Sequence, residues 1–200
     1  IAYRVPHISC YALTIEPGTA LQHFVNKGIS PPINQEQQAH QLELTSNYLM
    51  QNGYEHYEIS NYATIGFESK HNSNYWKGIP YWGFGPSAHS FDGQRKRSWN
   101  VANNNAYMSE IAKKNILVEE ESLSENQSLN EFIMIRLRTK DGIDLSEVKM
   151  KYGIEKMDEL QKGMQRFVNQ KHLVCKEDKY YVLSREGKIY ADGIASALFS

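Results

Sequence analysis

The sequence has 200 residues, 40% of them hydrophobic, and a mean hydropathy of -0.59, which is typical of a globular protein with one large or two small domains. Its 22 basic and 23 acidic residues nearly cancel, so the sequence lacks the basic excess of a dedicated nucleic-acid binder. No apolar run approaches the roughly 20 residues that span a bilayer, and the opening IAYRVPHIS does not resemble a signal peptide. We therefore expect a cytoplasmic protein that is not integral to a membrane and whose partners are small molecules or proteins.

The chain opens on Ile1 rather than on Met, and an apolar stretch follows almost at once, without a leading helix. This start predicts that the sequence is cut from a longer protein. The two cysteines, Cys10 and Cys175, have no second thiol or histidine at metal-ligand spacing beside them. We expect both to be buried, reduced thiols rather than metal ligands.

The first half of the chain alternates predicted strands and helices. The apolar and β-branched run over 7–15 predicts a strand, and Thr19 can cap the helix that follows it. Apolar residues at helical spacing predict a longer helix over 34–51, with Asn34 as its N-cap. Further strands are expected at 54–59 and 81–91. This order predicts an α/β unit with a parallel sheet.

The second half has a different pattern, and the acidic, serine-rich residues 118–126 are expected to be a linker into it. A helix over 101–115 precedes them. Beyond them we expect helices and a two-stranded ribbon, an arrangement typical of a winged helix, with helices at 125–138, 145–152, 154–170 and 185–199 and strands at 173–175 and 180–183.

The motif HNSNYW gathers a histidine, two amides and two aromatic rings within six residues. His71 could supply an imidazole to a metal, while Tyr75 and Trp76 could offer flat apolar faces to a planar ligand. Alternatively, Asn72 or Asn74 caps a short helix and the two aromatic rings fill the core. The spacing alone favours this second interpretation.

Two other motifs could serve a ligand or the fold. WGFGPSAHS, at 82–90, has glycines at alternate positions, which would let a bound nucleoside or amino acid approach the backbone, or would permit tight packing. YEISNYA places Glu58, Ser60 and Asn61 at a strand end, where α/β barrels collect functional groups. A structural hydrogen-bond network explains these three residues better. The basic run at 95–97 could attract carboxylates, although a solvated loop is the simpler interpretation.

Taken in order, HISCYALTIEPGT, YEISNYA, HNSNYW, GFGPSAHS and RSWNVANNNAY resemble the second half of the catalytic barrel in the HemW-type radical S-adenosylmethionine (SAM) heme chaperones. These are relatives of the oxygen-independent coproporphyrinogen III oxidases. HNxxYW points to the chaperone branch. The resemblance implies an α/β fold, in which the C-terminal half of an open radical SAM β/α barrel (1–117) is followed by a linker (118–126) and a winged-helix-like C-terminal domain (127–200).

The resemblance also implies cofactors, which are a 4Fe-4S cluster, S-adenosyl-L-methionine and heme in the intact protein. The family's CxxxCxxC cluster motif is absent here, and Cys10 and Cys175 cannot replace it, because a cluster needs three converging thiolates. We therefore expect this chain alone to carry no iron-sulfur cluster and to be inactive. Carried over from the family, Ala12 and His89 are candidate SAM-binding residues.

The family's motif also points to His71 as the candidate heme-iron ligand, with Tyr75 and Trp76 as walls of the heme site. Rival histidine ligands are His7, His23, His40, His56, His89 and His172.

The implied function is porphyrin and heme metabolism, in which the protein binds heme and delivers it to an acceptor protein. The alternative is a coproporphyrinogen III oxidase, in which a SAM-derived radical drives the oxidative decarboxylation of propionate side chains. A nucleic-acid-binding winged helix is disfavoured, because basic and acidic residues nearly balance over 124–200. An open barrel edge at the strand over 7–15 further predicts either a homodimer or an edge shielded by the chain's own ends.

Overall fold

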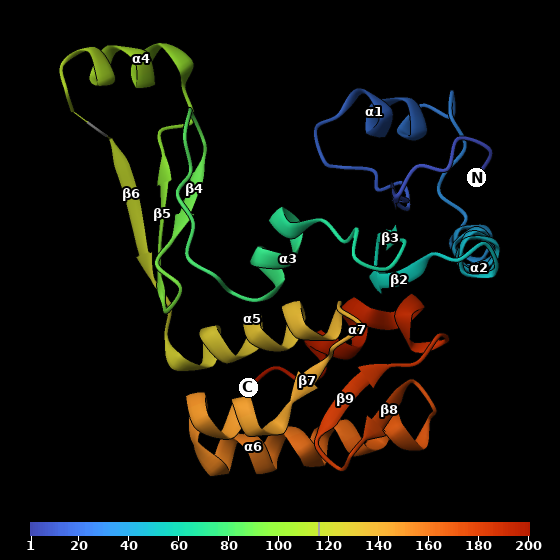
Figure 1. Cartoon of the computed structure of the whole chain (residues 1–200). Helices are drawn as coiled ribbons and strands as arrows, with labels where there is room; N and C mark the ends of the chain where they lie inside the picture. The colour runs from blue at the N-terminus through green and yellow to red at the C-terminus, as the bar shows by residue number, and fades with distance from the viewer. Residues whose placement is uncertain (116) are drawn as a thin grey trace. The chain divides into compact units, whose positions relative to one another are not determined.

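The computed structural model describes residues 1–115 and 117–200 and divides them into two compact units (Figure 1). The first unit spans residues 1–69 and the second spans 70–200.

The first unit has a small antiparallel sheet and two helices. Its elements are β1 (His7–Ser9), α1 (Ala20–Asn26), α2 (Gln35–Gln51), β2 (Glu55–Glu58) and β3 (Asn61–Ala63). The sheet has the order β1-β3-β2. Tyr62 in the central strand is fully buried and forms a hydrophobic cluster with Leu49 and Tyr54, against which Ile8 and Cys10 pack.

The side-chain caps predicted at the start of the two helices are confirmed. The Thr19 hydroxyl accepts a hydrogen bond from the Gln22 amide at 3.3 Å, so Thr19 caps α1 as predicted. The Asn34 side chain accepts from the Gln37 amide at 2.9 Å and caps α2. Both caps satisfy amide groups that the first turn of a helix leaves without a partner.

The predicted parallel sheet is wrong, because both pairings in this unit are antiparallel. Only residues 59 and 60 separate β2 from β3, and so short a connection can join antiparallel strands only, whereas a parallel pair needs a crossover of a dozen or more residues. The strand expected over 7–15 is also shorter than predicted, since β1 ends at Ser9.

The second unit begins with α3 (Lys70–Trp76) and a second antiparallel sheet. This sheet has the order β4-β5-β6 and is built from β4 (His89–Phe91), β5 (Lys96–Asn100) and β6 (Val118–Ser122), with α4 (Asn104–Ala112) between β5 and β6. Figure 1 shows these three strands as a long ribbon with α4 at one end. Of the strand predicted over 81–91, only β4 is observed as a strand. An isolated β-bridge pairs Tyr81 with Phe91.

The predicted linker contains a strand, because the acidic run faces the basic run that the sequence suggested was a solvated loop. β6 pairs with β5 along five residues. Lys96 forms an ion pair with Glu120 at 2.9 Å, and Arg97 lies 3.6 Å from Glu121. Opposite charges on adjacent strands stabilise a sheet. The domain boundaries themselves, at 117 and 127, stay a prediction.

The rest of the second unit follows the predicted order of helices and strands, except for a short strand at 143–144 that was not predicted. Its elements are α5 (Glu125–Leu137), β7 (Ile143–Asp144), α6 (Leu145–Asn169), β8 (Leu173–Lys176), β9 (Tyr180–Leu183), a short 3-10 helix (Gly187–Tyr190) and α7 (Ala191–Ser196). The antiparallel sheet β7-β9-β8 packs with these helices (Figure 1). Gly153, with φ 87° and ψ 169°, interrupts α6 between the two helices that the sequence predicted.

Candidate functional site at helix α3

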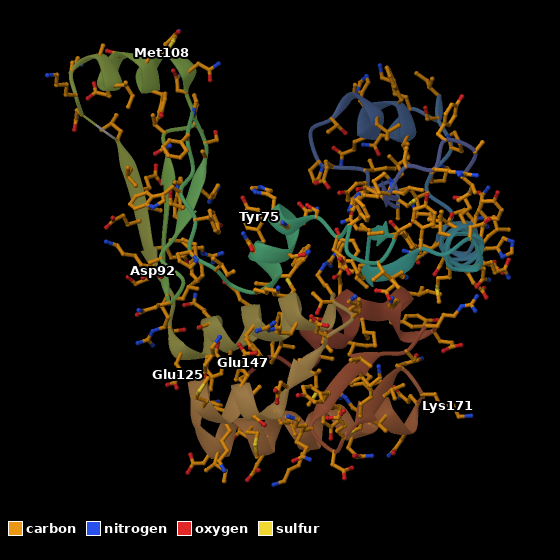
Figure 2. The ribbon with its side chains drawn as sticks, viewed as in Figure 1. Tyr75, Asp92, Met108, Glu125, Glu147 and Lys171 are labelled. Atoms are coloured by element: carbon orange, nitrogen blue, oxygen red, sulfur yellow. The ribbon has the colours of Figure 1, made fainter. Side chains whose placement is uncertain are left out.

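HNSNYW forms most of α3, so its two end aromatics and its histidine are displayed on a helix. His71 and Tyr75 lie four positions apart and therefore share one face. Their ring centroids are 5.0 Å apart in an edge-to-face arrangement, and Tyr75 makes a second edge contact with Tyr81 at 4.6 Å. His71 is exposed, and Figure 2 labels Tyr75 on this helix. The imidazole is thus accessible to a ligand beside an aromatic surface.

Trp76 is partly buried, whereas His71 on the same helix is exposed to solvent. The guanidinium carbon of Arg138 lies 5.9 Å from the centroid of the Trp76 ring, close enough for a cation–π contact. The indole Nε1 is buried and has no hydrogen-bond partner within the described part of the chain. A buried donor without a partner is unusual in a folded protein.

A cavity of about 180 Å³ lies next to α3 within the second unit. Aromatic rings form part of its walls, and they are those of Tyr75, Trp76, Tyr81, Phe91, Phe132 and Tyr152. His71 does not line it. Pockets for small-molecule ligands usually measure about 300–1,000 Å³, so this cavity can take part of a large planar ligand but not the whole of one.

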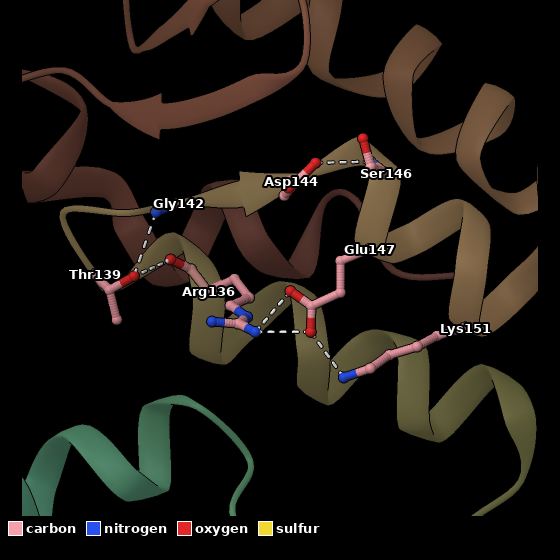
Figure 3. Close-up of polar contacts among 7 residues, drawn as sticks. All are labelled: Arg136, Thr139, Gly142, Asp144, Ser146, Glu147 and Lys151. Carbon is pink, nitrogen blue, oxygen red and sulfur yellow. Dashed lines mark hydrogen bonds and ion pairs between the residues drawn. The ribbon is translucent and has the colours of Figure 1, made fainter.

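Charged residues border the same cavity. Arg97 forms an ion pair with Glu131, and both residues line the cavity. On the α5–α6 side, Arg136 Nη2 donates to both oxygens of Glu147, at 2.7 and 2.6 Å, and Lys151 Nζ donates to one of them at 2.8 Å (Figure 3). Figure 2 marks Glu147 in this region of the second unit.

The two carboxyl groups respond differently to this environment. Burial raises the pKa of Glu131, and the opposing charge and hydrogen bond of Arg97 only partly offset that rise. Burial also acts to raise the pKa of Glu147, but the hydrogen bonds from Lys151 and Arg136 outweigh it, so the pKa of Glu147 is lowered. Glu147 is therefore firmly ionised at neutral pH.

His89 lies exposed in β4, where its ring is 5.8 Å from that of Trp99. The neighbouring glycine motif has a packing role, because a Cβ on Gly83 would come within 2.2 Å of the His89 carbonyl oxygen. The Asn100 amide donates to the carbonyls of both Gly83 and Gly85, at 3.3 and 2.9 Å. Of the two interpretations of this motif, the structure supports tight packing.

Ala12 lies exposed in the first unit, in the segment between β1 and α1. The roles of Ala12 and His89 in SAM binding stay predictions.

YEISNYA forms the structural network that the sequence favoured. Glu58, only 2% exposed, accepts hydrogen bonds from the Ser60 amide at 3.0 Å and from the Asn61 side chain. The Asn61 side chain in turn accepts from the Ser9 hydroxyl. This chain of hydrogen bonds ties β1 to β3 and satisfies a buried carboxyl group.

Sequence reasoning missed the half of the cavity wall that α5 and α6 supply. Glu131, Phe132 and Tyr152 lie more than fifty residues after α3, and no spacing in the sequence relates them to HNSNYW. The only local signal was the basic run containing Arg97.

The structure also bears on metal and membrane sites. Among the described residues, no group of three or more His, Cys, Asp or Glu is arranged to hold a metal ion, and no helix is long and apolar enough to cross a membrane. Cys10 and Cys175 are both partly buried free thiols, and burial raises the pKa of Cys10.

Comparison with known proteins gives consistent relatives. The heme chaperone HemW of Bacillus subtilis is 30% identical over 192 residues, which are 96% of this chain and 50% of that protein. The heme chaperone HemW of Mycobacterium tuberculosis H37Rv is 35% identical over 145 residues, covering 72% of this chain and 37% of the relative. The zebrafish (Danio rerio) radical S-adenosyl methionine domain-containing protein 1, mitochondrial, is 32% identical over 145 residues, 68% of this chain and 33% of the relative.

A solved structure and a domain family agree with these relatives. The structure of coproporphyrinogen III oxidase (HemN) from Escherichia coli, a radical SAM enzyme, matches 84% of this chain and 42% of its own chain, with a TM-score of 0.62 and 15% identity, so it shares the fold. Residues 123–190 match the HemN C-terminal domain. The chain spans half or less of the length of these relatives. As its motifs predicted, the chain belongs to the HemW-type family of radical SAM proteins, and residues 123–190 are its HemN C-terminal domain.

Proposed function

We propose that the chain is part of a radical SAM heme chaperone that binds heme and hands it to an acceptor protein. The observation that carries this proposal is the exposed imidazole of His71, which stands against the ring of Tyr75 on α3. A single histidine is a common axial ligand of heme iron. Tyr75 and the cavity beyond it supply apolar and aromatic surface for the porphyrin.

The direct test is the absorption spectrum of heme bound to this chain. His71→Ala is expected to shift the heme absorption band, because that band reports the axial ligand. Trp76→Leu is expected to weaken binding and leave the band in place, since burial of the ligand against the cavity contributes affinity without coordination. His89→Ala is the matched control, because His89 is also exposed.

An unchanged spectrum and affinity in His71→Ala would contradict the proposal and leave HNSNYW as a structural helix. A band shift in His89→Ala instead would move the ligand to β4.

The cluster and SAM chemistry belongs to the intact protein. The two cysteines of this chain are fewer than the three converging thiolates that the cluster needs, so the residues present do not fit a 4Fe-4S cluster. After anaerobic reconstitution we expect this chain to retain no iron-sulfur absorbance. Near-stoichiometric iron and sulfide would refute that expectation.

The second candidate function is that of a coproporphyrinogen III oxidase, which the structural similarity to HemN favours. HNSNYW and the names of the sequence relatives favour the chaperone. The intact protein, supplied with SAM, a reductant and coproporphyrinogen III without oxygen, discriminates between them. Release of CO₂ with formation of vinyl groups would establish the oxidase.

We also propose that the intact protein has an acceptor protein, that the chain forms a homodimer, and that its location is cytoplasmic. β1 forms one edge of the sheet in the first unit, and exposed edge strands recruit partners. Sedimentation at several concentrations should show a dimer that Tyr11→Lys weakens, because Tyr11 is 74% exposed just beyond β1. A monomer at all concentrations would contradict the edge-to-edge dimer.

A further inference from the structure

We propose that the cavity beside α3 binds one carboxylate arm of the porphyrin whose iron His71 ligates, an inference that rests on the proposed function. The cavity of about 180 Å³ has room for several water-sized groups. A propionate arm, which is two methylenes and a carboxylate, fits within that space. The porphyrin ring itself would lie outside, against Tyr75.

The cavity wall carries more hydrogen-bond donors than acceptors paired with them. Trp76 lines the cavity, and its buried Nε1 has no partner in the described part of the chain. Lys77 follows it in sequence and also lines the cavity. Within the described ranges the Lys77 ammonium makes no ion pair or side-chain hydrogen bond. Lys77 is exposed to solvent, so only the buried Trp76 Nε1 lacks an acceptor altogether. A carboxylate at the cavity would supply that acceptor and give Lys77 an ion-pair partner.

The charged side chains around the cavity do not balance. The other three cations that line the cavity already have carboxylate partners, Arg97 with Glu131 and Glu121, and Arg136 and Lys151 with Glu147. Lys77 is the cation left over among the described lining residues. One additional carboxylate, rather than two, would therefore neutralise the site.

Tyr75 connects the His71 ring to the cavity. Tyr75 contacts the His71 ring and also lines the cavity, so it spans the distance between the two. Heme carries its iron at the centre of the ring and its propionates at the edge. A porphyrin held at its centre by His71 would thus extend one edge past Tyr75 toward Lys77.

The test compares hemin with hemin dimethyl ester, which keeps the iron and the ring but removes the carboxylate charges. We expect this chain to bind the free acid roughly tenfold more tightly, the effect of one charge-assisted hydrogen bond. Lys77→Gln should abolish that preference, Lys77→Arg should keep it, and Trp76→Phe should reduce it. The absorption band should stay unchanged in both Lys77 variants, because neither touches the axial ligand.

Lys149→Gln is the matched control, since it removes one exposed positive charge on α6 away from the cavity lining. Equal affinity of the unmodified chain for acid and ester would overturn the carboxylate site while leaving the His71 band test intact. A loss of preference in Lys149→Gln as large as in Lys77→Gln would overturn it too, because general surface charge would then explain the effect. Failure to bind either porphyrin would contradict both this inference and the proposed function.

Discussion

At the scale of single residues, Glu147 receives three hydrogen bonds from two cations (Figure 3). The Glu147 and Arg136 side chains are only 22% and 17% exposed, so water screens this pair less than a surface pair. We expect Glu147→Gln to lower the free energy of unfolding by about 2 kcal/mol at pH 7, the range for hydrogen bonds to charged groups, measured by chemical denaturation.

The matched control is Glu159→Gln, which removes an ion pair with Lys156 at 3.4 Å from a side chain that is 65% exposed. Surface pairs contribute little, so this change should cost under about 0.5 kcal/mol. Equal effects of the two substitutions would show that the α5–α6 pair stabilises no more than a surface pair does.

The lowered pKa of Glu147 also predicts a pH dependence. Burial acts to raise this pKa, but the hydrogen bonds from Lys151 and Arg136 lower it overall. A carboxyl group with a lowered folded-state pKa contributes stability that is full above its unfolded pKa of about 4.3 and is lost as the pH falls through the folded-state value. The stability gap between the natural chain and Glu147→Gln should therefore narrow below about pH 4.3. A gap that widens on acidification would contradict this assignment.

At the scale of elements, Gly153 allows the chain to break α6 into two helices. Its φ of 87° and ψ of 169° lie in a region that only glycine adopts without strain, costing other residues about 1–3 kcal/mol. No atom lies within 4 Å of a Cβ at this position, so an alanine side chain would clash with nothing. The effect of Gly153→Ala therefore reports backbone strain alone. We expect Gly153→Ala to destabilise the chain by about that amount in denaturant titrations.

Gly193 in α7 is the control, because a Cβ there also meets nothing within 4 Å and its backbone lacks a positive φ. Alanine favours the helix by up to about 1 kcal/mol over glycine, so Gly193→Ala should stabilise the chain. Stabilisation by Gly153→Ala as well would mean that the break in α6 is not needed.

At the scale of the whole molecule, the two units differ in the size of their cores. The first has a small cluster around Tyr62. The second buries aliphatic residues on several elements, with Leu129, Ile133, Leu137, Val148 and Met164 each at most 1% exposed. Regions with fewer buried contacts open more readily, so amides in β1–β3 should exchange hydrogen faster than amides in α5 and β9. Uniform protection across both units, measured by mass spectrometry, would contradict this prediction.

The sequence by itself determined the features that depend on neighbouring residues. The caps at Thr19 and Asn34, the break at Gly153 and, apart from β7, the order of elements after residue 124 were predicted, because a cap, a turn or a helical period is specified within a few positions. The family was also predictable, since its motifs are short and lie in a set order. The six residues of HNSNYW alone favour a structural interpretation, and the family resemblance makes them the candidate heme site.

Only the tertiary structure decided which distant segments meet. The antiparallel pairing of β1 and β3 joins residues more than fifty positions apart, and the acidic run became strand β6 because a basic strand lies beside it. The cavity likewise combines Trp76 and Lys77 with Glu131 and Tyr152 from later helices. Such contacts depend on burial and on charge pairing across the fold, which no spacing within one segment encodes.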